Sequence, residues 1–188
     1  MCAGGGGRSP DLQSTESHYI AAGGCKTVAE AVLEGKVDCG FALVRPPGHH
    51  AMRSVHGARG FCNINIEAVM VEHVRHTYGV DRVAIVDTDC HHGDGTQNIY
   101  WHDPDTLFIS LHQDGRTLYP GSGFTSEMGG PNALGTTVNI PLPPMTTETA
   151  PRTFTGMTLT PYLLVYIKMA APSIPVQALL VRWEGQMH

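Results

Sequence analysis

The sequence has little charge, few aromatic residues and no Cys-x-x-Cys motif. Charged residues make up 15% of its 188 residues and aromatic residues 7%, whereas hydrophobic residues make up 41%. This composition excludes wholesale disorder and favours one globular domain with a hydrophobic core. The five cysteines are odd in number and have no paired spacing, which argues against a disulfide framework or a zinc ribbon. We therefore expect a reducing compartment, either the cytoplasm or, in a eukaryotic cell, the nucleus.

The sequence also lacks an excess of positive charge and a clean hydrophobic span. Its net charge of -5 argues against direct binding of nucleic acid. The first seven residues contain four consecutive glycines and do not have the charged-then-apolar order of a signal peptide. The stretch 162–181 is apolar overall but contains one lysine and two prolines, so we expect no membrane contact. No pattern predicts the oligomeric state.

Strand and helix patterns alternate along the chain. Short apolar runs predict strands at 39–44, 83–86, 106–111 and 136–140. Helical spacing predicts helices at 27–33, 66–78 and 96–101. This alternation predicts an α/β fold with a three-layer α/β/α arrangement around a parallel sheet. We expect a flexible lead at 1–13, one partial domain at 14–144 and an atypical Thr- and Pro-rich tail at 145–188, so that the sheet is incomplete.

Ionisable residues cluster where the strand at 83–86 ends. Because side chains alternate along extended backbone, Asp87, Asp89 and His91 are expected to point one way, and Thr88, Cys90 and His92 the other. Asp89 and His91 then form an oxygen–nitrogen pair that suits a divalent metal. In the plainer alternative, the Asp89 carboxylate caps the following turn and His91 is a polar loop residue. The density of charge near a buried strand favours the metal site, since an unpaired buried charge costs several kcal/mol.

A second candidate pair, His49 and His50, follows a proline-rich break at 45–48, at the end of the strand predicted for 39–44. An imidazole that is bonded to a carboxylate has a fixed tautomer and acts as a general base in hydrolases. Asp87 and Asp94 are the natural carboxylate partners. The alternative is that the two histidines lie on a solvent-exposed turn.

Four motifs in this order resemble the zinc-dependent histone deacetylase family. They are Arg45-Pro-Pro-Gly-His-His-Ala51, Gly60-Phe-Cys-Asn63, Asp87-x-Asp-x-His-His-Gly-Asp-Gly-Thr-Gln97 and Ser110-Leu-His112. The residues of these motifs are most similar to the class II branch and its bacterial relatives, which include acetylpolyamine amidohydrolases. The resemblance extends from about Ser14 to Pro144. The resemblance implies the arginase/deacetylase-like fold and a substrate that is an acetylated lysine peptide, on a histone or another protein, or an acetylpolyamine.

The resemblance also implies a role for each matching residue. Asp89 and His91 would bind zinc, His50 with Asp94 would be the general base–acid pair, and His49 with Asp87 a second, electrostatic pair. Asp87 and Ser110 would contribute to a potassium site. Gly60 and Phe61 would line a narrow channel for the acetyl-lysine stem, although Phe61 also fits an ordinary core position.

Two motifs that the resemblance leads us to expect are absent from the sequence. These are Ala-Gly-x-Asp, which supplies the third zinc ligand, and a Gly-Gly-Tyr loop, which supplies the oxyanion donor. We therefore expect impaired catalysis by this chain alone. Two alternatives stay open: a non-catalytic fragment that acts as a weak metal binder or interaction module, and a manganese-dependent, ureohydrolase-like enzyme.

Overall fold

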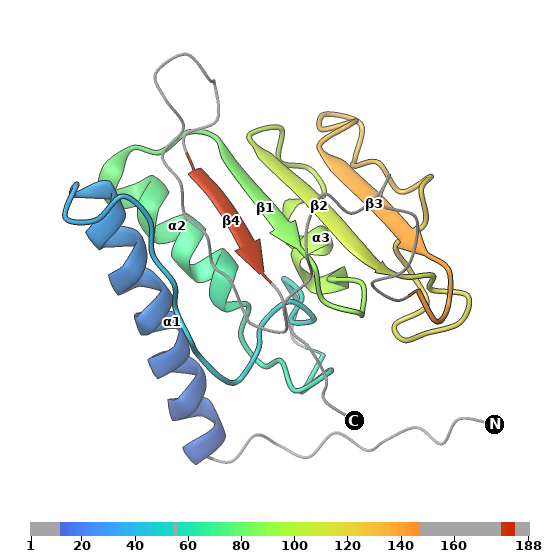
Figure 1. Ribbon diagram of the computed structural model, residues 1–188, viewed down its shortest axis with the longest axis horizontal. Helices are drawn as coiled ribbons and strands as arrows, with labels where there is room; N and C mark the ends of the chain where they lie inside the picture. The colour runs from blue at the N-terminus through green and yellow to red at the C-terminus, as the bar shows by residue number, and fades with distance from the viewer. Residues whose placement is uncertain (1–11, 55, 147–177, 183–188) are drawn as a thin grey trace.

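The computed structural model describes residues 12–54, 56–146 and 178–182. Within these ranges the chain forms three helices and four strands (Figure 1). In chain order they are α1 (Leu12–Leu33), α2 (Ile66–Tyr78), β1 (Val83–Asp87), α3 (Asp94–Tyr100), β2 (Thr106–Gln113), β3 (Thr137–Leu142) and β4 (Ala178–Arg182).

The four strands form one parallel sheet in the order β3-β2-β1-β4 (Figure 1). All five residues of β1 are buried, as the unbroken apolar run predicts for an inner strand. In the register between β1 and β2, Asp87 lies opposite Ser110. The carboxyl ends of these two strands therefore meet at the same edge of the sheet, where ligands bind in open α/β folds.

The hydrophobic core lies between the helices and one face of the sheet. Ile85 and Phe108, which are cross-strand neighbours, pack with buried residues of α1 and α2 such as Cys25 and Met70. The other face of β2 is only half-buried in the described part of the chain. The observed fold is thus an incomplete α/β arrangement in which the described helices cover the Ile85 face.

Helix α2 has the predicted bounds, and its ends explain them. The Asn65 side chain accepts a hydrogen bond from Ala68 N at the start, and Gly79, with φ of 65°, ends the helix in the left-handed conformation. The face that α2 turns to the core contains Met70, Val71 and Val74, whereas Val69 is 39% exposed. None of the helices in the described ranges is long and apolar enough to cross a membrane.

Two predictions about the N-terminal part need correction. Helix α1 begins at Leu12, fifteen residues before the predicted start at Thr27 and just inside the segment expected to be a flexible lead. The predicted strand at 39–44 is wrong for the described part of the chain, because these residues form no ladder with any described strand. Its side chains alternate instead: Ala42 is buried against the core, whereas Leu43 is 76% exposed.

The remaining strands extend beyond the predicted bounds. Strand β2 runs to Gln113 and so includes His112, and β3 runs from Thr137 to Leu142. In the segment 145–188, five residues form β4, which pairs with β1 along its whole length. The rest of that predicted tail, 147–177 and 183–188, lies outside the described residues.

Candidate active site

The loop that carries the histidine pair is fixed against the start of α3. Thr96 N donates a hydrogen bond to His49 O at 3.0 Å. Gly95 approaches the backbone of this loop so closely that a Cβ atom would lie 2.5 Å from the carbonyl carbon of His50 and 2.5 Å from Ala51 O. A glycine at this position is therefore a packing requirement, and it brings His49 and His50 to the carboxyl end of β1.

Both predicted histidine–carboxylate pairs are present. His49 Nδ1 lies 2.8 Å from Asp87 Oδ2, and His50 Nδ1 lies 2.7 Å from Asp94 Oδ1. The two imidazoles are 2% and 3% exposed, so the alternative of a solvent-exposed turn is wrong. Their ring centroids are 4.0 Å apart. In each pair the carboxylate accepts the Nδ1 proton, which leaves Nε2 with the lone pair.

The Asp94 carboxylate is shared with a residue that the sequence analysis did not select. Arg59 Nη2 lies 2.8 Å from Asp94 Oδ2. Burial acts to raise the pKa of Asp94, but the His50 hydrogen bond and the positive charges nearby outweigh it and hold the pKa below its usual value. Burial is also the largest influence on His50 and lowers its pKa, although the hydrogen bond to Asp94 opposes this shift. The pair therefore favours a neutral imidazole beside an ionised carboxylate.

The chain turns sharply after β1 and gathers three potential metal ligands. Asp89 N donates to Asp87 Oδ1 at 3.0 Å, and His91 N donates to Asp89 Oδ1 at 2.7 Å. His91 Nδ1 lies 3.2 Å from Asp89 Oδ1 and 3.2 Å from Cys90 Sγ. The predicted alternation is thus wrong for Cys90, because the extended backbone ends at Asp87 and the turns bring its thiol to the His91 side.

These contacts show how Asp89 meets the two alternatives, a metal ligand and a cap of the following turn. Asp89 does cap the turn, as the plainer alternative proposed, but the same oxygen also faces His91 Nδ1. The hydrogen bonds to Asp89 and then Cys90 raise the pKa of His91 to about 10. Asp89 is 4% exposed, and the ligand atoms of Asp89, Cys90 and His91 all lie within 4.8 Å of one another. Carboxylate, thiolate and imidazole are all zinc donors, so this cluster fits a divalent metal.

Gly60 and Phe61 lie beside the histidine pair. A Cβ atom on Gly60 would overlap the His50 ring, so glycine allows this segment to pack against the imidazole. Phe61 has a φ of 65° and is 72% exposed, which rules out the core interpretation of its side chain. A large apolar side chain held out to solvent in the left-handed region is an uncommon and costly arrangement.

Tyr119 is a further site residue that the sequence analysis missed. Its ring centroid lies 5.0 Å from that of His50 and 6.1 Å from that of His91, and the Arg59 guanidinium lies 5.9 Å from it. The loop that follows Gly115 reaches the site through this residue. Nothing in its local spacing could have identified it, because its contacts are with residues at least 28 positions earlier in the chain.

A group of buried polar side chains that includes His92, His112, Gln97 and Ser110 lies next to the site. The rings of His92 and His112 lie 4.8 Å apart, and both side chains are buried. His92 contacts Gln97 Oε1 at 3.0 Å, and His112 Nδ1 lies 2.8 Å from Ser110 Oγ. Burial and the nearby charge of His112 lower the pKa of His92 to about 4. Ser110 and Asp87 are cross-strand neighbours, but the potassium site expected there stays a prediction.

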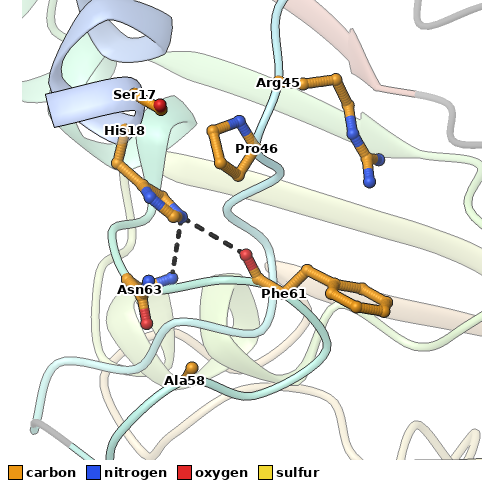
Figure 2. A pocket seen from close by; sticks show the side chains of 7 residues that line it. All are labelled: Ser17, His18, Arg45, Pro46, Ala58, Phe61 and Asn63. Carbon is orange, nitrogen blue, oxygen red and sulfur yellow. Dashed lines mark hydrogen bonds between the residues drawn. The ribbon is translucent and has the colours of Figure 1, made fainter. Parts of the chain in front are cut away.

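A pocket of about 490 Å³ lies beside this region and is lined by Ser17, His18, Arg45 and Phe61, among others (Figure 2). His18 is buried, and its Nε2 accepts a hydrogen bond from Asn63 N at 3.1 Å. Figure 2 shows the Phe61 carbonyl facing His18 while the Phe61 ring points away from it. The histidine–carboxylate pairs do not line this pocket, so it is a neighbour of the candidate site.

Comparisons with known proteins place these features in context. The family model described as Histone deacetylase domain matches residues 10–167. The chain is 50% identical over 127 residues to a probable deacetylase of Archaeoglobus fulgidus, a match that covers 68% of this chain and 34% of that protein. It is 42% identical over 143 residues to histone deacetylase 14, chloroplastic, of Arabidopsis thaliana, which covers 73% of this chain and 33% of that protein.

A solved structure is similar as well. The crystal structure of the HDA15 HD domain matches with a TM-score of 0.61 and 45% sequence identity, over 66% of this chain and 36% of that chain. The chain therefore spans about a third of the length of these relatives.

Proposed function

Because the chain belongs to the histone deacetylase domain family, we propose that it is the part of a zinc-dependent amidohydrolase that carries the general base and two metal ligands. The reaction is hydrolysis of the acetyl amide of an acetyl-lysine side chain or an acetylpolyamine. The observation that carries this proposal is the pair of buried imidazoles, each bonded to a buried carboxylate, beside Asp89 and His91.

Asp89 and His91 are the residues that would hold zinc. A carboxylate oxygen and an imidazole nitrogen face each other here at 3.2 Å, and both are donors that zinc prefers. When bound, zinc supplies a Lewis acid for the acetyl carbonyl. Asp87 and Ser110 are proposed as part of a separate potassium site, since they lie side by side on β1 and β2.

His50 is proposed as the general base. Its Nδ1 proton is bonded to Asp94, so Nε2 is the nitrogen that takes a proton from the attacking water. The water oxygen forms a bond to the acetyl carbon. His50 then gives the proton to the amine nitrogen as the carbon–nitrogen bond breaks, and acetate and the free amine are released. The lowered pKa of His50 suits this role, because the base is neutral when water attacks.

His49 is proposed to assist without exchanging protons with the substrate. Its Nδ1 proton is held by Asp87, which also accepts the Asp89 backbone N–H. The His49 ring therefore lies next to the His50 ring, with centroids 4.0 Å apart, and the Asp87 carboxylate lies at the Nδ1 side of the His49 ring. The His49–Asp87 pair would stabilise positive charge that develops on His50 during proton transfer.

Phe61 and Tyr119 are proposed to form two sides of the substrate channel. Phe61 is exposed and follows Gly60, which packs against the His50 ring, and the Tyr119 ring forms T-shaped contacts with the rings of His50 and His91. Two aromatic walls suit the apolar four-carbon stem of lysine or the chain of a polyamine, whose charged end stays in solvent. A reducing compartment, the cytoplasm or nucleus, stays a proposal that rests on the odd number and the spacing of the cysteines in the sequence.

Turnover by this chain alone is expected to be slow. The sequence contains no Ala-Gly-x-Asp motif for a third zinc ligand and no Gly-Gly-Tyr loop for an oxyanion donor. Loss of one oxyanion donor alone costs about 10²–10³-fold in kcat. This absence favours a second candidate function, a non-catalytic metal-binding or interaction fragment.

Acetate release from an acetyl-lysine peptide and from an acetylpolyamine, with added zinc, tests the proposal. We expect His50→Ala to lose about 10²–10⁴-fold of any activity. His73→Ala is the matched control, since that histidine pairs with Glu30 on the helices away from the site. Activity that survives His50→Ala would remove the mechanism, zinc binding with no activity would favour the second candidate, and urea release with manganese would favour a ureohydrolase.

A further inference from the structure

The turn after β1 places a thiol where the sequence pattern alone does not. Two successive side-chain-to-backbone hydrogen bonds, Asp87 with Asp89 N and Asp89 with His91 N, fold residues 87–91 back on themselves. Cys90 Sγ therefore lies 3.2 Å from His91 Nδ1, on the side that also holds Asp89 Oδ1. The Cys90 backbone is fixed at this place because its carbonyl accepts a hydrogen bond from Gln113 N at 3.0 Å.

The three side chains offer one donor atom each. Among the described residues, Asp89, Cys90 and His91 bring a carboxylate oxygen, a sulfur and an imidazole nitrogen within 4.8 Å of one another. Zinc binds these donors at about 2.0–2.3 Å in a tetrahedral arrangement, which places two donor atoms roughly 3.3–3.8 Å apart. His91 Nδ1 lies 3.2 Å from Asp89 Oδ1 and 3.2 Å from Cys90 Sγ, close to that spacing. Asp89 is buried and Cys90 is exposed, so the donor set reaches from the protein interior to the surface.

We propose that Cys90 is a metal ligand in this chain and forms a compact oxygen–sulfur–nitrogen site with Asp89 and His91. This inference rests on the proposed zinc site and adds a sulfur atom to its ligand set. A thiolate selects zinc and other borderline or soft ions over magnesium and calcium. Because a thiolate donates more charge to the metal than a carboxylate does, the site is a better binder and a weaker Lewis acid.

The competing interpretation is that Cys90 only hydrogen-bonds His91. In that case the thiol has no influence on metal affinity and stays reactive when metal is added. Cys39 is a suitable comparison, because it is the other exposed cysteine in the described residues. Cys2 lies outside those residues and is also replaced in the control, so that its thiol cannot account for metal binding.

Cobalt(II) is the probe, because sulfur-to-cobalt charge transfer gives a near-ultraviolet band that nitrogen and oxygen ligands do not give. The full-length chain is titrated with cobalt(II) as wild type, as Cys90→Ser, and as the control Cys2→Ser/Cys39→Ser. We expect the band in the wild type and the control. We expect Cys90→Ser to lose it and to bind cobalt(II) at least roughly 10-fold more weakly. His91→Ala should also lose the band, which ties the sulfur to this site.

Alkylation gives an independent readout that does not depend on catalysis. With zinc present, we expect iodoacetamide to modify Cys39 but not Cys90, as measured by peptide mass spectrometry, and to modify both after chelation. Circular dichroism checks that Cys90→Ser folds; if it does not, the alkylation pattern of the wild type decides. Binding of cobalt(II) without the sulfur band would overturn the Cys90 assignment and leave the Asp89–His91 site standing. A sulfur band that persists in His91→Ala would also overturn it.

Discussion

Arg59 and Asp94 form an ion pair of 2.8 Å on the side of the carboxylate that His50 does not use. Asp94 is 7% exposed, and each of its carboxylate oxygens has a partner: Oδ1 accepts from His50 and Oδ2 pairs with Arg59. A buried carboxylate bonded on both sides cannot rotate without breaking one contact. The ion pair thus fixes the orientation of the carboxylate to which the proposed general base is bonded.

We expect Arg59→Met to lower the free energy of unfolding by about 1–3 kcal/mol, because Asp94 Oδ2 is left buried without its charged partner. Urea denaturation measures this change. Arg116→Met is the matched control, since its ion pair with Asp114 is at the surface, where Arg116 is 74% exposed, and should contribute less than about 1 kcal/mol. Equal losses in the two variants would contradict a buried, orienting ion pair.

We expect Gly95→Ala to destabilise the fold by about 1–3 kcal/mol, because the added methyl group meets backbone atoms of His49, His50 and Ala51, which cannot move aside as a flexible side chain would. Thermal and urea unfolding measure the loss. Gly23→Ala in α1 is the control, because nothing lies within 4 Å of its added Cβ atom. That substitution should instead stabilise the helix, by up to about 1 kcal/mol. A tolerated alanine at position 95 would show that the histidine loop is not held as described.

We expect Phe61→Ala to raise KM for an acetylated substrate by roughly 10-fold, equivalent to about 1.4 kcal/mol of binding, with stability nearly unchanged. The side chain is 72% exposed, so its removal leaves no cavity in the core. Tyr19→Ala, an aromatic truncation at a 66% exposed position of α1, should leave KM unchanged. Steady-state kinetics with the zinc-loaded protein distinguish the two. A large loss of stability in Phe61→Ala would restore the core interpretation.

We expect the free energy of unfolding to fall at acidic pH partly through Asp103. Burial acts to raise the pKa of Asp103, but hydrogen bonds from Arg75 and Thr106 outweigh it and hold the pKa below 3.8. A carboxyl whose pKa is lowered by folding stabilises the protein above its unfolded pKa, and this contribution is lost as the pH falls through the folded pKa.

Asp103→Asn should therefore flatten the fall in stability below about pH 4, as measured by urea denaturation at several pH values. Asp105→Asn is the control, because that side chain is exposed. If the slopes of Asp103→Asn and of the wild type coincide, the Arg75–Asp103 pair has no role in acid stability.

The sequence predicted those parts of the fold that depend on neighbouring residues. The helical periodicity of 66–78 predicted helix α2, and the apolar run 83–86 predicted strand β1. The abrupt change to ionisable residues after that run predicted that the site begins where β1 ends. The motifs, read together, also predicted the family. The residues by themselves indicated that Asp87 and Asp94 are the carboxylate partners of the two histidines. The resemblance to the family assigned His49 to Asp87 and His50 to Asp94.

What the sequence by itself determined is therefore the family, the parallel sheet and the residue types at its carboxyl edge. Only the tertiary structure decided that 39–44 pairs with none of the described strands, that Arg59 and Tyr119 lie at the site, and that the thiol of Cys90 turns toward His91. The Cys90 thiol turns because side-chain-to-backbone hydrogen bonds of Asp87 and Asp89 end the extended conformation that the alternation assumed. For the other findings the physical reason is range, because a periodic pattern records what a residue does with its near neighbours. A ladder needs a partner strand, and an ion pair or ring contact 28 or more residues away in the chain leaves no trace in local spacing.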